Sequence, residues 1–430
     1  MKLPTLFFLV LAAAGLRTGV EAEAGAAFYL MDGDRVVFYG DSITEQRLYS
    51  AYVESFVVTR FPRLKVTFVH SGWGGDRVSG GGGGSINTRL KRDVVAYRPS
   101  VVTIMLGMND GAYRPFDGQV FEQFTTGYDH ILEVLGRELP GARLTLITPS
   151  PHDDVTRPLK FPGGYNAVMA RYSDYVKGLA GRTHATVADF NAPLVAVLQT
   201  AFKMDTNLAV RLIPDRVHPA PAGQLAMAGE LLKAWGAPGV VSKVRLDGGR
   251  GLVAETERCA VSGLRKGAGL EWDEMDESLP MPADFKDPLV LLVLTCSDFV
   301  EALDRETLQV TGLDAPSLEL RIDGERVGVY TRENLAAGIN LATVPTPMLA
   351  QAMAVQELTV EHNDVHFARW RQVEMKVKAR GLPALDEALG ALDRLEAEIL
   401  QLRGKTALPV RHHFELVPES KIFNNSEKPK

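Results

Sequence analysis

The stretch VVFYGDSIT, residues 36–44, joins a short apolar run to a polar turn. Its first four residues are β-branched or aromatic, which is typical of a buried strand. A segment with helical periodicity follows at residues 48–61, so the turn lies between a strand and a helix. Ser42 is therefore predicted to project from the carboxyl end of a strand, near a helix N-terminus whose backbone N–H groups can stabilise an oxyanion.

The same order of a short β-branched run and a longer helical segment repeats as far as about residue 237. Strands that are apolar on both faces and alternate with helices indicate a parallel sheet covered on both sides. We therefore predict a three-layer α/β/α domain over residues 25–239, with its site at the carboxyl ends of the strands. Further strands are expected at residues 66–69, 101–106, 144–148 and 186–188.

The pattern changes after residue 239. Residues 240–345 contain short strand-like runs and a hairpin signal, which predict a small β-rich region. Residues 346–418 are expected to form a helical C-terminal extension, with leucines at spacings of three and four that indicate an amphipathic helix. Packing of this helix on its own protein is favoured over a dimer seam, because fewer than three clean heptads are present. The polar tail, residues 419–430, is expected to be disordered.

The ends and the charge of the chain bear on its location and partners. The 430 residues carry a formal net charge of −6 at pH 7, so nucleic acid is not expected as a partner. Residues 1–24 combine Lys2, an apolar run and small residues near a cleavage point, as a signal peptide does. We expect a secreted or periplasmic protein; a retained anchor and a buried first helix are the alternatives. No later run reaches the roughly 20 apolar residues that a membrane-spanning helix needs.

A base for Ser42 is present later in the sequence. A serine hydroxyl is a weak nucleophile and needs a base to take its proton. Asp215 and His218 lie three residues apart, in a predicted loop just before a helix that begins at Ala220. This spacing lets the carboxylate orient the imidazole and stabilise its charged form. The alternatives are a helix cap for Ser42 and an exposed loop histidine for His218.

Two further clusters follow predicted strands. Gly75, in the segment SGWGGD, lacks a side chain and can bring its backbone N–H close to a substrate oxygen. Asn109, in the segment GMND, offers a side-chain amide as a second donor. Glycine and asparagine are also ordinary turn formers, so each segment alone has a structural alternative. Because all these clusters follow strands or precede the last helix, we expect them to meet in one site.

In four successive blocks the chain resembles the SGNH hydrolase superfamily, also called GDSL-like esterases. The resemblance covers roughly residues 34–237 and implies a flavodoxin-like fold with five parallel strands in the order 2-1-3-4-5. It implies Ser42 as the nucleophile, His218 as the base and Asp215 as its orienting partner, with no metal or organic cofactor. It also implies an oxyanion hole made by the N–H groups of Ser42 and Gly75 and the side chain of Asn109. The blocks are Gly40-Asp41-Ser42, Gly75, Gly107-x-Asn109-Asp110 and Asp215-x-x-His218.

The resemblance and the expected export together predict a secreted serine esterase that cleaves carboxylic esters through an acyl-enzyme. Its expected substrates are small-molecule or polysaccharide esters, with acetyl esters of carbohydrate favoured. An acyltransferase that uses the same acyl-enzyme and a carbohydrate-binding protein on the same fold stay open. The sequence predicts neither the oligomeric state nor the role of residues 240–430. The predicted substrate-binding residues, for which rim and turn roles are the alternative, are Asp41, Trp73, Asp110 and Tyr113.

Two other pairs of residues have spacings or residue types that allow a disulfide or a metal site. Cys259 and Cys296 form either one disulfide, as an exported protein allows, or two buried free thiols. His362 and His366 have the i, i+4 spacing of metal ligands on a helix. The sequence suggests no third ligand for them, so no metal site is expected.

Overall fold

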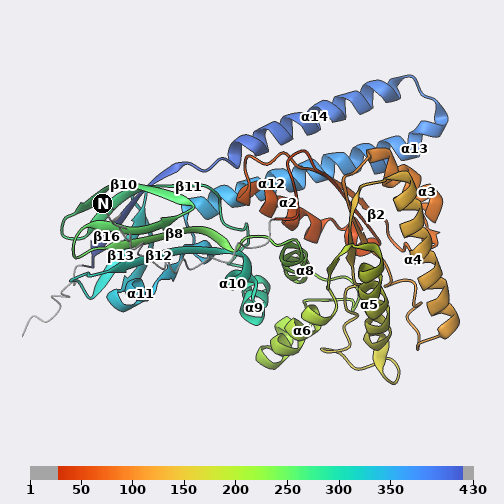
Figure 1. Cartoon of the computed structure of the whole chain (residues 1–430), viewed down its shortest axis with the longest axis horizontal. Helices are drawn as coiled ribbons and strands as arrows, with labels where there is room; N and C mark the ends of the chain where they lie inside the picture. Colours follow the sequence, from red (N-terminus) through yellow and green to blue (C-terminus); the bar gives the residue numbers. More distant parts are fainter. Residues whose placement is uncertain (1–27, 420–430) are drawn as a thin grey trace, which may run out of the picture.

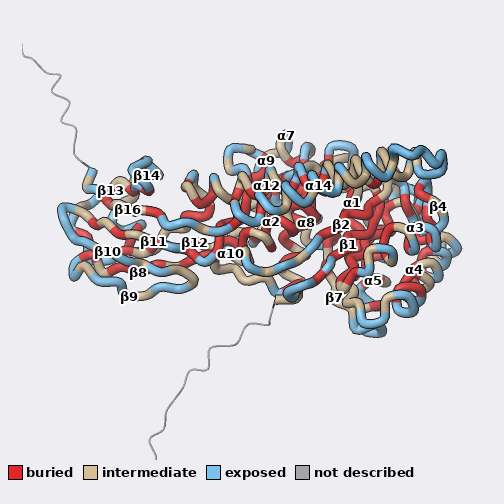
Figure 2. Tube along the Cα trace, turned by 90° about the horizontal axis from the view of Figure 1, so that it is seen from above, coloured by how far each residue is buried: buried red, intermediate tan, exposed pale blue. Residues whose placement is uncertain are grey.

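The computed structural model describes residues 28–419. The predicted signal peptide, residues 1–24, and residues 420–430 of the predicted tail lie outside the described residues. Figure 1 shows an α/β lobe and a β-rich lobe side by side along the long axis, with a pair of long helices extending from one lobe over the other. Figure 2 shows buried segments in the strands of both lobes, and each lobe has its own apolar core.

The α/β lobe is built on a five-stranded parallel sheet. Its strand order, β2-β1-β5-β6-β7, is the predicted flavodoxin-like order once the two-residue strands β3 (Gly80–Gly81) and β4 (Gly84–Ser85) are set aside as a separate hairpin. All residues of β1 after Arg35 are buried, because helices cover both faces, and this explains the continuous apolar runs in the sequence. The strands are β1 (Arg35–Gly40), β2 (Thr67–Gly72), β5 (Val101–Met105), β6 (Arg143–Ile147) and β7 (Thr186–Ala188).

Helices lie on both faces of this sheet, which confirms the predicted three layers (Figure 1). Helices α2 and α8 pack together on the face toward the β-rich lobe, and α3, α4 and α5 lie on the opposite face. Helices α4 and α5 contact each other through Phe124 and Tyr172, whose ring centroids are 4.3 Å apart. The bounds are α2 (Leu48–Arg60), α3 (Ile86–Asp93), α4 (Gly118–Glu138), α5 (Gly164–Thr183), α6 (Ala192–Met204) and α8 (Pro221–Ala234).

Residues after 239 also contribute to the core of the α/β lobe. Helices α9 (Pro288–Cys296) and α10 (Phe299–Leu303) pack on α8. Their side chains Val293 and Phe299 belong to the same apolar core as the parallel sheet. The α/β lobe therefore takes in residues from beyond the segment that the sequence assigned to it.

The β-rich lobe consists of two sheets that enclose a second core around Trp272 and Phe414. One sheet has the order β10-β11-β16-β13-β14 and the other the order β15-β12-β8-β9. The strands are β8 (Val240–Asp247), β9 (Leu252–Glu257), β10 (Cys259–Lys266), β11 (Leu270–Asp276), β12 (Arg305–Thr311), β13 (Ser317–Ile322), β14 (Glu325–Thr331), β15 (Ile339–Asn340) and β16 (Arg411–Pro418).

The prediction that residues 346–418 are helical throughout is wrong for Arg411–Pro418, which form β16. This strand pairs with β11 on one side and β13 on the other, so it lies in the middle of its sheet. Its inward positions, His412, Phe414 and Leu416, alternate with more exposed ones, as a strand with one buried face requires. The partners that make this segment a strand lie more than ninety residues earlier in the chain, beyond the reach of local periodicity.

The long helices form what we call the helical arm, residues 347–406. Helices α12 (Pro347–Phe367) and α14 (Ala384–Thr406) contact each other, so the predicted amphipathic helix packs on its own chain. Between them lie the π-helical segment η3 (Ala368–Glu374) and the short helix α13 (Met375–Val377). Within residues 28–419, no helix is long and apolar enough to cross a membrane.

A buried polar cluster fixes the helical arm to the α/β lobe. Glu54 of α2 is within 2.5 Å of Arg403 Nη1 from α14 and 3.0 Å of His70 Nε2 from β2. Asn363 of α12 donates to the same carboxylate over 3.3 Å. Burial opposes ionisation of Glu54, but Arg403 and His70 outweigh it and lower its pKa to about 2. Separating α14 from α2 would leave the buried carboxylate of Glu54 without Arg403, which would strongly destabilise the folded protein. This ion pair therefore holds the arm on α2.

Candidate active site

Ser42 lies at a tight turn between β1 and the short helix α1 (Ser42–Glu45). Gly40 ends the strand, and a Cβ there would lie 2.2 Å from Thr44 Oγ1 and 2.8 Å from the Met105 carbonyl oxygen, so only glycine fits. Asp41 caps α1, because its Oδ1 accepts the Ile43 N–H over 3.0 Å. This turn places Ser42 at the carboxyl end of the central part of the sheet, as the sequence predicts.

His218 connects Ser42 to Asp215 through two short hydrogen bonds. Its Nε2 is 2.8 Å from Ser42 Oγ, and its Nδ1 is 2.6 Å from Asp215 Oδ2. The other carboxylate oxygen, Asp215 Oδ1, accepts the backbone N–H groups of Val217 at 2.9 Å and His218 at 2.7 Å. The structure thus brings together the three predicted residues, from segments more than 170 positions apart, in the geometry of a nucleophile, base and orienting acid.

The carboxylate of Asp215 stays ionised in this arrangement. Partial burial alone would raise its pKa, but the hydrogen bonds from the backbone and ring of His218 outweigh burial and lower the pKa of Asp215. The pair is nevertheless open to solvent, with side-chain exposures of 54% for Asp215 and 31% for His218. An open depression of about 520 Å³ lies beside them and is also lined by Ser42, Glu45 and Gln46.

The loop that carries the acid and base is held by the segment after β6. Arg216 has a φ of 74°, a left-handed conformation that is uncommon for a side chain of this size. Its carbonyl accepts the Asp153 N–H over 2.8 Å, and its Nη1 donates to the Pro158 carbonyl over 2.8 Å. These contacts stabilise the turn that folds His218 back onto Asp215.

Gln224, which the sequence did not single out, ties the two halves of the site together. It is fully buried at the start of α8. Its Nε2 donates to Gln46 Oε1 over 2.5 Å and to the Pro219 carbonyl over 3.1 Å, and its Oε1 accepts the Tyr49 N–H over 3.0 Å. One side chain therefore joins the region after Ser42 to the residue that follows His218.

The loop after β2 presents Gly75 at the surface. The Trp73 N–H donates to the Gly40 carbonyl over 3.0 Å, so the loop is attached to the end of β1. Gly75 has a φ of 76°, which side-chain-bearing residues rarely adopt. The N–H groups of Ser42 and Gly75 have no acceptor within residues 28–419, so both are available to a ligand.

Asn109 lies against this loop. Its Nδ2 donates to the Asp76 carbonyl over 3.0 Å, and its Oδ1 accepts from the Tyr113 hydroxyl over 2.9 Å. These two bonds fix the orientation of the amide and leave its second N–H for another acceptor. Beneath the loop, Asp76 is fully buried and paired with Arg89 at 2.6 Å.

The four predicted substrate-binding residues differ in how far they are exposed. Tyr113 is 38% exposed beside Asn109, which fits a rim position. Asp41 is 1% exposed, and the carboxyl of Asp110 is turned inward, where its Oδ1 accepts the Val78 N–H over 3.0 Å. Burial raises the pKa of both carboxyls to about 7. One carboxylate oxygen of each residue thus accepts a backbone N–H, that of Ile43 for Asp41 and that of Val78 for Asp110, and their role in substrate binding stays a prediction.

Trp73, the fourth predicted substrate-binding residue, is largely covered by the protein itself. Its ring lies against Arg371 and packs edge-on against Trp370, with ring centroids 6.1 Å apart. Positions 82 and 83 approach the same ring, and a Cβ on Gly83 would come within 2.6 Å of it. Trp73 thus contacts the helical arm and the glycine-rich loop, and the sequence could not show either neighbour.

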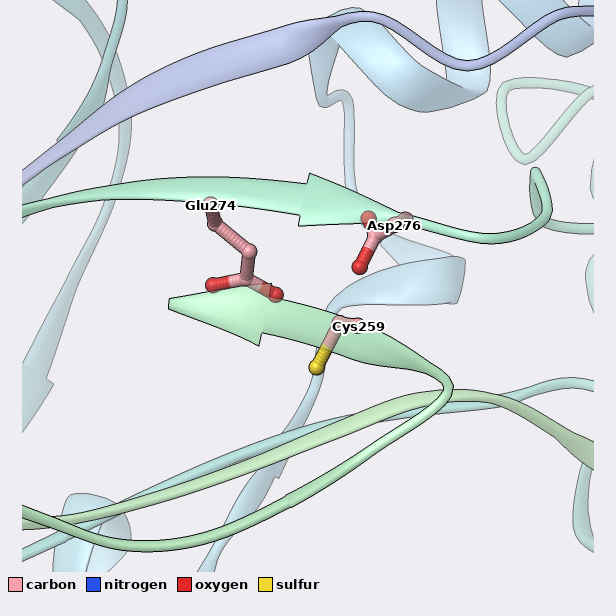
Figure 3. A group of neighbouring side chains, drawn as sticks. All are labelled: Cys259, Glu274 and Asp276. Atoms are coloured by element: carbon pink, nitrogen blue, oxygen red, sulfur yellow. The ribbon is translucent and has the colours of Figure 1, made fainter. Parts of the chain in front are cut away.

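Groups of potential metal ligands lie outside this site. Figure 3 shows Glu274 and Asp276 of β11 and Cys259 of β10 with their side chains on the same side of the sheet, and their ligand atoms lie within 4.8 Å of one another. Burial raises the pKa of Cys259 to about 12 and that of Asp276 to about 6, so the thiol keeps its proton at neutral pH. Both Cys259 and Cys296 are free thiols in the described part of the chain.

His362 and His366 have a neighbour that the sequence did not reveal. His366 Nδ1 is 3.1 Å from Glu396 Oε2, and His362 Nε2 is 3.7 Å from the same oxygen. Glu396 comes from α14, thirty residues later, and joins the two helices of the arm. The contacts of these histidines therefore belong to the packing of the arm.

Comparison with known proteins places this site in a family context. Residues 38–226 match the model of the GDSL-like Lipase/Acylhydrolase family. An acetylxylan esterase of Geobacillus stearothermophilus is 26% identical over 225 residues, which cover 47% of this chain and 94% of that protein. The solved structure of a gut microbial diltiazem-metabolizing enzyme is similar with a TM-score of 0.78 and 25% identity, over 91% of this chain and 98% of its own. The second likeness therefore includes the β-rich lobe and the helical arm.

Proposed function

We propose that this protein, a carboxylic ester hydrolase whose residues 38–226 form a GDSL-like lipase/acylhydrolase domain, removes acetyl groups from carbohydrate esters. The proposed reaction passes through an acyl-enzyme on Ser42. The observation that carries this proposal is the continuous hydrogen-bonded chain from Ser42 Oγ through His218 to Asp215. All three side chains lie at the carboxyl edge of the sheet, next to an open depression that a bulky ester can reach.

In the proposed reaction, Ser42 Oγ attacks the ester carbonyl and His218 Nε2 takes its proton. Asp215 keeps the ring in the tautomer with a proton on Nδ1 and stabilises the imidazolium that forms. The alcohol leaves with the proton from Nε2, and the acetyl group stays bonded to Ser42. A water molecule, deprotonated by His218, then attacks the carbonyl carbon of this acyl group. The bond to Ser42 Oγ breaks, His218 Nε2 returns the proton to Ser42 Oγ, and acetic acid leaves.

The tetrahedral intermediates carry negative charge on the former carbonyl oxygen. The free N–H groups of Ser42 and Gly75 and the second N–H of the Asn109 amide are the donors that we assign to this oxygen. Each is held before the substrate arrives, by α1, by the left-handed turn and by the bonds to Asp76 and Tyr113. Loss of one such donor costs roughly 10²–10³-fold in rate.

Two observations support carbohydrate acetyl esters as substrates. The acetylxylan esterase named above is similar over nearly its whole length. The exposure of Asp215 and His218 suits a polymer that meets the site at the surface. Export through residues 1–24 is part of the same proposal, because it would bring the enzyme to such polymers. The likeness to the diltiazem-metabolizing enzyme extends over most of this chain, so small drug-like esters are a second candidate class of substrate.

The test compares acetate release from acetylated xylan, para-nitrophenyl acetate and diltiazem, itself an acetate ester. The variants are Ser42→Ala and, as a matched control, Ser79→Ala, an exposed serine in the neighbouring loop. We expect release from xylan by the wild type and the control, with at least a thousand-fold loss in Ser42→Ala. Full activity of Ser42→Ala would overturn the serine mechanism, and activity confined to the small esters would overturn the carbohydrate assignment.

The two alternative functions give different results in the same experiment. An acyltransferase would convert excess sugar alcohol into a new ester at the expense of free acetate. A carbohydrate-binding protein would bind xylan saturably and release no acetate from it.

A further inference from the structure

The segment η3 of the helical arm meets the two elements that carry Ser42 and Gly75. We propose that Arg371, about 145 positions beyond the end of the family domain at residue 226, is a positioning residue of the esterase site. It fixes the carboxylate of Glu45 and the ring of Trp73, and through them the nucleophile helix and the loop of Gly75. This inference rests on the proposed ester hydrolysis at Ser42.

The helical arm reaches the site along one side of the α/β lobe. Helix α12 packs on α2, and near its end Asp364 pairs with Arg47 at 2.6 Å. The guanidinium of Arg47 also lies 4.4 Å from the centre of the Phe367 ring. Arg47 is the residue before α2, five positions after Ser42, so the arm is attached next to the nucleophile helix before η3 begins.

Arg371 then contacts both active-site elements at once. Its Nη2 is 3.1 Å from Glu45 Oε1, at the last position of α1. Its guanidinium lies over the ring of Trp73, which directly precedes Gly74 and Gly75 in the sequence. Trp370 packs edge-on against the same ring. The arginine is largely covered, with 19% of its side chain exposed, so its position is restricted.

Glu45 transmits this contact to the reacting atoms. It lies three residues after Ser42 and lines the open depression beside His218. A Cβ on Gly74 would lie 2.8 Å from Glu45 Oε2 and 4.0 Å from Ser42 Cβ, so the carboxylate packs against the backbone of the Gly75 loop. Without Arg371 this carboxylate would stand unpaired beside the place where the oxyanion develops, and like charges repel strongly where water is partly excluded.

The backbone of η3 is itself unusual. Seven residues, Ala368–Glu374, form a π-helix, a conformation that is rare and frequently found at functional sites. Within it, Trp370 and Arg371 face the α/β lobe, whereas Arg369 pairs with Asp393 of α14 and with Glu374. The segment thus directs Arg371 toward the active site and Arg369 toward α14.

This difference supplies a matched control in the full-length protein. Arg371→Ala removes the contact to Glu45 and Trp73, and Arg369→Gln weakens the arm without touching either residue. We expect Arg371→Ala to lower kcat for para-nitrophenyl acetate about 10- to 100-fold, with KM changed less than about threefold, because the loss falls on transition-state stabilisation. Arg369→Gln should lower the melting temperature but leave kcat within about twofold of the wild type.

A second variant separates charge from simple loosening. In Arg371→Ala combined with Glu45→Gln, the unpaired carboxylate is absent, so kcat should recover at least threefold over Arg371→Ala alone. Wild-type kcat in Arg371→Ala, or an equal fall in Arg369→Gln, would overturn the inference. If Ser42→Ala is inactive while Arg371→Ala keeps full activity, only this inference fails; if Ser42→Ala stays active, the proposed function fails first.

Discussion

Replacing Asp215 by asparagine should harm the enzyme more than replacing it by alanine. In the wild type, Oδ1 of Asp215 accepts two backbone N–H groups, from Val217 at 2.9 Å and His218 at 2.7 Å, and Oδ2 faces His218 Nδ1 at 2.6 Å. An asparagine must keep its only oxygen at the two backbone donors. Its NH₂ group then donates to His218 Nδ1, so the proton of the neutral ring moves to Nε2. A protonated Nε2 cannot accept the proton of Ser42.

The expected magnitudes follow from this geometry. Alanine removes a hydrogen bond to a charged group, worth roughly 1.5–3 kcal/mol, or about 10- to 150-fold in rate. Because Asp215 is 54% exposed, water can partly replace it and the low end applies. Asparagine imposes the wrong tautomer, which in serine hydrolases costs about 10⁴-fold in kcat.

The assay is kcat/KM for para-nitrophenyl acetate at pH 7–8, with the melting temperature of each variant as a control for folding. We expect the order wild type, Asp215→Ala, Asp215→Asn, with at least a tenfold gap between the two variants. An Asp215→Asn enzyme as active as Asp215→Ala, or more active, would refute the assignment of the two carboxylate oxygens.

Three further predictions follow. Gln224→Ala should lower the free energy of unfolding by about 1–3 kcal/mol in urea titrations, because the Tyr49 N–H loses its buried acceptor; an unchanged unfolding midpoint would contradict this role. Gly75→Ala meets no atom within 4 Å but must adopt a φ of 76°, so kcat should fall about tenfold or more with little change in KM, and a wild-type kcat would count against the donor role of Gly75. Burial raises the pKa of Asp276 from 3.8 to about 6, so the folded state binds more protons than the unfolded state in this range and loses stability as pH rises through it. Above pH 6 the melting temperature of Asp276→Asn should therefore rise relative to that of the wild type. A difference in melting temperature that does not vary with pH would contradict the shifted pKa.

Much of the α/β lobe could be predicted because its determinants are local. Each buried parallel strand appears in the sequence as a continuous apolar run, and the polar turns after β1, β2 and β5 mark one edge of the sheet. The spacing of Asp215 and His218 is local too, so their contact could be anticipated. The contact of His218 with Ser42 spans 176 positions and followed from the resemblance together with the rule that the site lies at the strand ends.

The parts that the sequence missed depend on distant contacts. The strand β16 exists because β11 and β13 lie on either side of it, and the preceding helix gave its region a helical appearance. The backbone contacts of Asp41 and Asp110 could not be predicted, since an acidic residue at a turn looks the same in the sequence whether it faces a ligand or a backbone N–H. Nothing local to Arg371 shows that it meets Glu45, because that contact depends on how the arm lies across α2.

The most direct test of the central claim is to identify the residue that becomes covalently modified. The wild-type protein would be treated with an activated organophosphonate ester, digested and analysed by mass spectrometry. We predict one modified peptide, with the phosphonate on Ser42, appearing in parallel with loss of esterase activity and absent from Ser42→Ala. Activity lost through modification of another residue, or activity retained with Ser42 fully modified, would contradict the assignment of Ser42 as the nucleophile.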